Sequence, residues 1–97
     1  MKQPCVYIMT NKYNKVLYVG VTSDLVQRVE RHKTKFYKKS FTAQYNCDKL
    51  VYYCHFATML EAIAFEKKLK AGSRAKKVAL VEAMNPDWVE IAALRSQ

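Results

Sequence analysis

Two short apolar segments separated by a polar run open the chain. Residues 4–10 and 16–22 are rich in β-branched and aromatic side chains, and the residues between them are mostly polar. Two such segments joined by a polar turn predict an antiparallel β-hairpin. The hairpin would bring the phenol groups of Tyr7 and Tyr18 close together, although they are distant in the sequence.

A glycine interrupts the second of these segments near its end. Gly20 leaves one position without a side chain in an otherwise apolar run. A glycine inside a strand marks either a bend, or a place where backbone or ligand approaches closely. The local sequence does not choose between these two interpretations.

The next predicted element is a helix that continues to about Lys35. Residues 22–24 read Thr-Ser-Asp and supply candidates for its N-cap. Arg28 and His32 lie about one turn apart in this helix, so they share one of its faces. The pair would contribute to a functional site only if that face points toward the two tyrosines.

A third strand and a second helix follow. Residues 49–56 are β-branched and aromatic and predict the strand. Thr58 and Glu61 have the spacing of a capping box, which predicts a helix that begins at Thr58 and ends at Gly72.

The end of the chain predicts two more helices. Ser73 is expected to cap a helix over residues 74–84. Pro86 ends that helix, and Asn85 would cap a short final helix with Pro86 at its first position. Three apolar residues would dock the final helix on the core: Trp88, Ile91 and Leu94.

This order of elements predicts the α/β (α+β) class. We expect one small three-stranded antiparallel sheet flanked by helices, and a single domain over residues 1–97. A chain of 97 residues has room for one core.

One carboxylate lies on the apolar face of the helix predicted over residues 58–72. Glu66 is near the middle of a stripe formed by Met59, Ala62, Ile63 and Leu69. A buried carboxylate is unfavourable without a partner, and either a lysine or arginine or a divalent metal would serve. One carboxylate suffices for Mg²⁺ when substrate phosphate and water supply the other oxygens. Both partners stay open at this point.

The charge of the chain points to an anionic partner. The net charge is +9, and the isoelectric point is about 9.6. Basic residues gather between Arg28 and Lys39, where they alternate with aromatic side chains, and again around the joint of the last two long helices. Such clusters are typical of a nucleic-acid footprint, although a solvated basic loop gives a similar pattern. The candidate contacts are Gly20, Lys33, Lys35, Lys38, Lys39, Lys70, Arg74, Lys76 and Lys77.

The cysteines indicate a reducing compartment. The three residues Cys5, Cys47 and Cys54 form no Cys-x-x-Cys pair, which disfavours both a disulfide framework and a structural zinc site. No apolar run is long enough to span a membrane, and the first residues lack the apolar core of a secretory signal. We therefore expect a cytoplasmic protein with no membrane partner.

The motifs together resemble the GIY-YIG nuclease superfamily, and within it the short stand-alone bacterial GIY-YIG proteins. The resemblance rests on residues 6–8 and 18–23, on Arg28, His32 and Glu66, and on residues 74–77 and 85–88. It covers nearly the whole chain. Two tyrosine motifs followed in order by an arginine and a glutamate form a specific combination, whereas each motif alone is weak.

The resemblance implies catalytic roles by position. Tyr7 and Tyr18 would line the active site, and one of them would deprotonate or orient the attacking water. Arg28 would bind the scissile phosphate, and His32 would assist the site. Glu66 would carry one divalent metal, usually Mg²⁺, for which Mn²⁺ could substitute.

Elementary chemistry sets conditions on these roles. A free tyrosine is a poor base at neutral pH, so we expect positive charge from the metal and Arg28 to lower the pKa of the acting phenol. The sequence does not say whether Tyr7 or Tyr18 is the base. Cys5 replaces the glycine of the first motif, and Val21 replaces a lysine often found after the second. These two departures affect rate and mechanism more than reaction class.

The implied function is a metal-dependent endonuclease that hydrolyses DNA. No extra domain that would select a target is recognisable, so we expect low sequence specificity and strong salt dependence. Branched, damaged or single-stranded DNA, in repair or recombination, stays open as substrate. The alternative is a nucleic-acid-binding module on a nuclease scaffold with little or no activity. A basic module for an acidic protein ranks last, because it leaves the ordered motif residues unexplained.

Overall fold

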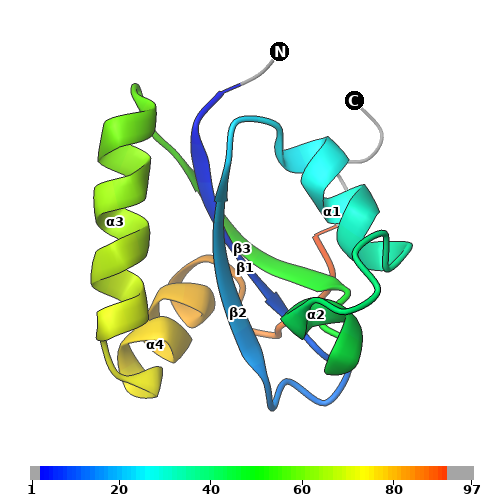
Figure 1. The fold of residues 1–97 in the computed structure, drawn as a ribbon. Coiled ribbons are helices and arrows are strands. Elements are labelled where there is room, and N and C mark those ends of the chain that lie inside the picture. The colour runs from blue at the N-terminus through cyan, green and yellow to red at the C-terminus, as the bar shows by residue number, and fades with distance from the viewer. Residues whose placement is uncertain (1–2, 92–97) are drawn as a thin grey trace.

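The computed structural model describes residues 3–91 and has a three-stranded antiparallel sheet at its centre (Figure 1). The strands are β1 (Cys5–Thr10), β2 (Leu17–Thr22) and β3 (Lys49–His55), in the order β2-β1-β3. β1 and β2 form the predicted hairpin, with Tyr7 opposite Gly20 in the register. Because β1 lies between the other two strands, all six of its residues are buried.

Within the described residues, four helices surround this sheet: α1 (Leu25–Lys33), α2 (Phe41–Gln44), α3 (Met59–Ala71) and α4 (Arg74–Met84). Asp24 caps α1 by accepting a hydrogen bond from the Gln27 backbone, and the predicted capping box at the start of α3 is present. α1 ends before the predicted Lys35, since Lys35 has a φ of 54° that a right-handed helix cannot include. The sequence did not predict the short helix α2.

The two faces of the sheet bury different sets of side chains. Alternate residues of a strand point to opposite faces. Tyr7 and the alternate β1 residues that share its face of the sheet pack with Leu25 and Val29 of α1. The other set, which includes Val6 and Ile8, packs against α3 and α4. Figure 1 shows α1 on one side of the sheet and α3 and α4 on the other, and β2 forms one edge of the sheet.

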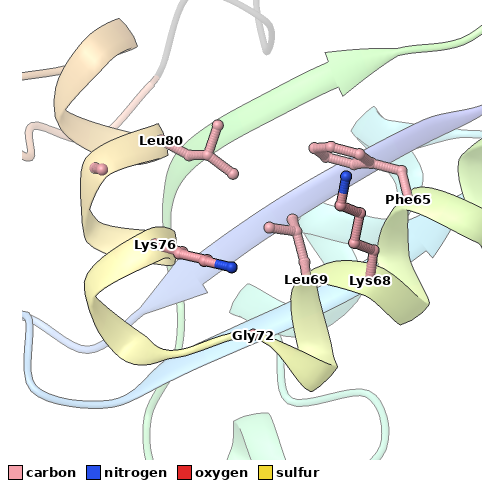
Figure 2. A pocket seen from close by; sticks show the side chains of 7 residues that line it. Phe65, Lys68, Leu69, Gly72, Lys76 and Leu80 are labelled. Carbon is pink, nitrogen blue, oxygen red and sulfur yellow. The ribbon is translucent and has the colours of Figure 1, made fainter.

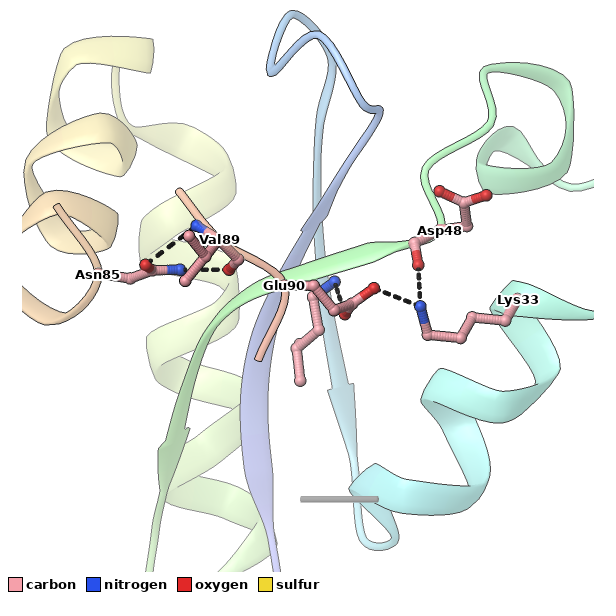
Figure 3. Close-up of polar contacts among 6 residues, drawn as sticks. Lys33, Asp48, Asn85, Val89 and Glu90 are labelled. Atoms are coloured by element: carbon pink, nitrogen blue, oxygen red, sulfur yellow. Dashed lines mark hydrogen bonds and ion pairs between the residues drawn. The ribbon is translucent and has the colours of Figure 1, made fainter. Parts of the chain in front are cut away.

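The short final helix is a wrong prediction for residues 86–91, which form a turn and an extended segment. Asn85 directs this path (Figure 3). Its side-chain amide donates to the carbonyls of Val51 at 3.2 Å and Val89 at 2.8 Å, and its carbonyl accepts from the Val89 backbone. The Ile91 backbone N–H then bonds to the Leu50 carbonyl at the edge of β3. Leu94 lies outside the described residues.

A lysine–glutamate pair ties this segment to α1 (Figure 3). The Lys33 ammonium pairs with the Glu90 carboxylate and donates to the Asp48 carbonyl at 2.8 Å. Glu90 also accepts a hydrogen bond from the Leu50 backbone at 2.9 Å. Lys33 therefore joins α1 to the start of β3. Among the helices within residues 3–91, none combines the length and apolarity that a bilayer crossing requires.

Replacing Asn85 with alanine should lower the free energy of unfolding by about 2 kcal/mol, because the buried carbonyl of Val51 and the part-buried backbone groups of Val89 lose their partners. Urea unfolding followed by circular dichroism measures this change. The matched control is Gln27→Ala on the exposed face of α1, which should change stability by less than about 0.5 kcal/mol. Equal effects of the two substitutions would contradict a structural role for the Asn85 amide.

Candidate active site

The ring of Tyr7 fills the space above Gly20. A Cβ atom added to Gly20 would lie 2.4 Å from both Cζ and the hydroxyl oxygen of Tyr7, closer than any tolerated contact. The glycine therefore allows a close approach, and the approaching group is a side chain of the neighbouring strand. A contact of Gly20 with nucleic acid stays a prediction.

The predicted proximity of the two phenols is confirmed. The ring centroids of Tyr7 and Tyr18 are 6.2 Å apart. Tyr7 is fully buried, whereas Tyr18 is half-buried and lines a surface hollow of about 280 Å³. Tyr18 is thus the member of the pair that faces the surface.

A chain of hydrogen bonds connects Tyr7 to α1 and to the start of α2. Its hydroxyl lies 2.9 Å from Nε2 of His32, and Nδ1 of His32 lies 2.8 Å from the Thr42 hydroxyl. Thr42 in turn contacts the Ser40 hydroxyl at 3.2 Å. The face of α1 that carries His32 does point toward the tyrosines. Sequence analysis missed Thr42, because α2 was not predicted and no local pattern links this residue to His32.

Burial shifts the pKa of both partners in the Tyr7–His32 hydrogen bond. Desolvation, together with the positive charge of Arg28, lowers the pKa of His32 to about 4. Desolvation also raises the pKa of Tyr7 well above its ordinary value, and Tyr18 adds to this rise. The net shift of the Tyr7 pKa is therefore upward, and the lowering expected from a metal and Arg28 together stays a prediction. Charge and hydrogen bonding from Arg28 do act in the expected direction, but burial outweighs them.

Arg28 and His32 consequently play different parts on the same helix face. The Arg28 guanidinium acts on the Tyr7 hydroxyl by charge and by hydrogen bonding. Because a guanidinium has only donors, the Tyr7 oxygen is the acceptor in its interaction with Arg28. The Tyr7 hydroxyl can donate its own proton to Nε2 of neutral His32, which lies at hydrogen-bond distance. When it does so, the His32 proton is on Nδ1, facing Thr42.

Glu66 comes from α3, on the other face of the sheet. Its side chain is 13% exposed, and its carboxylate pairs with Lys70 at 2.8 Å. Lys70 lines the same hollow as Tyr18, across the edge strand β2. The link between Glu66 and the tyrosines therefore runs through Lys70 and this hollow. Of the two partners that the sequence left open for Glu66, the lysine is the one in contact.

A metal at Glu66 would have few protein ligands. Within residues 3–91, no group of three or more histidine, cysteine, aspartate or glutamate side chains could enclose an ion. One carboxylate fits a hard cation that keeps most of its water and uses phosphate oxygens of a substrate. Mg²⁺ and Mn²⁺ match this donor set, and their binding would displace Lys70.

The candidate nucleic-acid contacts lie in several different places. Lys70 and Lys77 line the hollow beside Tyr18. Arg74 donates to the Asn14 carbonyl at 3.0 Å, and Lys35 donates to the Asn46 side chain at 2.6 Å. Lys33 is paired with Glu90, whereas Lys38 and Lys39 are exposed.

Lys76 lies elsewhere, at a separate groove (Figure 2). This groove of about 370 Å³ lies between α3 and α4 and is lined by Phe65, Leu69 and Leu80, with Lys68 and Lys76 extending along it. It uses a different face of α3 from the one that carries Glu66. The basic cluster expected around the joint of these helices therefore divides between two surfaces.

Comparison with known proteins agrees with this architecture. Residues 3–79 match the family model of the GIY-YIG catalytic domain, a range that includes both tyrosines, Arg28, His32 and Glu66. The solution NMR structure of the UPF0213 protein BH0048 from Bacillus halodurans is similar, with a TM-score of 0.56, 28% sequence identity and 89% coverage of each chain. No curated protein matches the chain.

The family carries a coarse functional meaning. GIY-YIG domains are nuclease domains, which implies a nucleic-acid substrate, and these nucleases generally depend on a divalent metal. The matched range includes every strand of the sheet and the helices that surround the tyrosine pair. The chain belongs to the GIY-YIG nuclease family.

Proposed function

We propose that the protein is an endonuclease that hydrolyses DNA phosphodiester bonds with one divalent cation bound at Glu66. The observation that carries the proposal is the hydrogen bond between Tyr7 and a neutral His32 beside Arg28. A buried phenol, a neutral imidazole and a guanidinium in contact supply a proton acceptor and an anion-binding group together. The proposal also includes a cytoplasmic location and a role in DNA repair or recombination.

Arg28 would bind the scissile phosphate. A guanidinium offers two parallel N–H donors to phosphate oxygens and stabilises the negative charge that grows on them in the transition state. Lys70 and Lys77 line the neighbouring hollow and would contact the flanking phosphates. Contacts of this kind bind the backbone without reading the bases, which supports low sequence specificity and strong salt dependence.

The two phenols would act as one unit in proton transfer. Tyr18 faces the hollow, and Tyr7 connects it to His32. As a water oxygen bonds to phosphorus and the bond to the leaving oxygen breaks, the proton of the water passes through the phenols to Nε2 of His32. This arrangement makes Tyr18 the phenol that meets the water and Tyr7 the inner relay.

Glu66 would hold the cation, with Mg²⁺ as the natural ion and Mn²⁺ as a substitute. When bound, the cation supplies Lewis-acid stabilisation of charge on the phosphate and the leaving oxygen. Binding of the cation would displace the Lys70 ammonium from Glu66, and Lys70 could then contact the DNA backbone. The weak donor set predicts that the ion binds tightly only together with substrate.

Replacing Glu66 with glutamine should reduce cleavage of plasmid DNA in Mg²⁺ by about 100-fold or more and leave DNA binding largely intact. Glu61→Gln on the same helix is the matched control, because glutamine preserves a capping box. A gel assay of cleavage with an anisotropy assay of binding measures both properties. Equal cleavage by both variants and the wild type would remove Glu66 from the mechanism.

The same assays separate the proposal from its alternative. A nucleic-acid-binding module predicts DNA binding by the wild type without cleavage in Mg²⁺ or Mn²⁺. That result would replace the hydrolase assignment with a binding function on the nuclease scaffold.

Thr42 should position His32 for its role as proton acceptor. Thr42→Val removes the hydroxyl at Nδ1 and should lower kcat by about 10-fold, with little effect on KM, because the wrong imidazole tautomer becomes populated. Thr42→Ser keeps the hydroxyl and should restore the rate. Nitrogen NMR of labelled His32 reads the tautomer directly, and an unchanged tautomer in the valine variant would exclude this role.

The lowered pKa of His32 predicts an acid-dependent loss of stability. Its value is about 4, against an ordinary value of 6.5, so between these pH values the unfolded chain binds a proton that the folded chain does not. The free energy of unfolding should therefore fall as the pH decreases from 6.5 to 4. Urea titrations of wild type and His32→Gln isolate this effect, since other groups titrate in both. Parallel pH profiles would contradict the shift.

A further inference from the structure

Three aromatic side chains form a row that begins at the tyrosine pair. We define the aromatic row as Tyr18, Phe41 and Tyr45. The Tyr18 and Phe41 rings are stacked, with centroids 6.1 Å apart and planes inclined by 28°, and the Phe41 and Tyr45 centroids are 4.7 Å apart. Phe41 is 46% exposed and Tyr45 is 49% exposed, so their rings face solvent instead of filling the core.

The helix α2 holds this row in place. Phe41 and Tyr45 lie about one turn apart, on the same side of α2 and the residue that ends it. Thr42, which lies between them in sequence, is buried and bonded to His32. The same short helix is therefore anchored inside the protein by Thr42 and presents aromatic rings outside. A cluster of adjacent exposed aromatic rings is typical of a binding surface.

Positive charge accompanies the row at both ends. Tyr18 and Phe41 line the hollow of about 280 Å³ whose other walls include Lys70 and Lys77. Beyond Tyr45, a second hollow of about 320 Å³ is lined by Lys12 and by Tyr13, which is 66% exposed. The three rings thus lie between two groups of lysines, and Asp48 also lines the second hollow.

We propose that the aromatic row stacks against unpaired nucleobases, so that the substrate is a single-stranded nucleic acid or a single-stranded segment of a larger one. Bases in a duplex are already paired and stacked, whereas unpaired bases offer their faces to aromatic side chains. Flanking ammonium groups bind the phosphates of such a strand. The inference rests on the proposed function, because it places this strand at the Tyr18 end of the row, beside the reacting groups.

A second exposed aromatic pair serves as an internal comparison. Phe36 and Tyr37 are in contact, with centroids 4.9 Å apart, but both are engaged by Arg31. The Arg31 guanidinium lies 4.7 Å from the centre of the Phe36 ring, and it donates to the Tyr37 hydroxyl at 3.0 Å. These rings are exposed without joining the aromatic row, which makes Phe36 a matched control for Phe41.

The test is a binding measurement that does not depend on turnover. Fluorescence anisotropy with EDTA present would compare labelled oligothymidylate, the same strand paired with oligodeoxyadenylate, and oligouridylate. Phe41→Leu keeps an apolar side chain but removes the aromatic face, and it should weaken oligothymidylate binding by about 5-fold or more. Phe41→Trp should restore binding, and Phe36→Leu should leave it unchanged. Circular dichroism melting checks that each variant is folded.

The outcomes are distinct for this inference and for the proposed hydrolysis. Equal loss of duplex and single-strand binding in Phe41→Leu, or equal loss in Phe36→Leu, would overturn the aromatic row as a base-stacking site. Preference for oligothymidylate or oligouridylate identifies DNA or RNA as the source of the unpaired bases. Single-strand binding without cleavage in Mg²⁺ would refute the hydrolase alone. Cleavage confined to duplex DNA would refute the inference alone.

Discussion

The packing of the Tyr7 ring over Gly20 is the constraint on which the candidate site depends. Only a residue without a Cβ atom leaves room for the phenol at this point of the register. The ring then directs its hydroxyl to His32, and His32 holds Thr42 in place. One close approach between two strands thereby aligns β1, β2, α1 and α2 around a single chain of hydrogen bonds.

The candidate site connects to Glu66 around the edge strand β2. α1 and α3 cover opposite faces of the sheet, and the edge strand β2 packs against α3 (Figure 1). Lys70 makes that connection, because it pairs with Glu66 on α3 and lines a hollow with Tyr18. The lysine neutralises a largely buried carboxylate that a hydrated cation would otherwise balance. Under the proposed function, exchange between these two partners couples metal binding to substrate binding.

The lysines of this protein have different structural roles. Lys33 is held by Glu90 and the Asp48 carbonyl and stabilises the path of the C-terminal segment. Lys76 lies over an apolar groove between two helices. Lys70 and Lys77 lie beside the tyrosine pair. The net charge of +9 therefore belongs to the whole chain, and under the proposed function Lys70 and Lys77 are the lysines that contact the phosphates flanking the scissile one.

Sequence alone determined most of the local elements, because strand alternation and the Thr58–Glu61 capping box act through neighbours in the chain. It also brought Tyr7 and Tyr18 together, since one hairpin joins them. Only the tertiary structure decided the partners of Glu66, the pKa of Tyr7 and the place of Thr42. Each of these depends on burial or on contacts between distant segments. The turn after α4 also depended on tertiary contacts, because the hydrogen bonds of Asn85 to Val51 in β3 and to Val89 replaced the helix that the local sequence favoured.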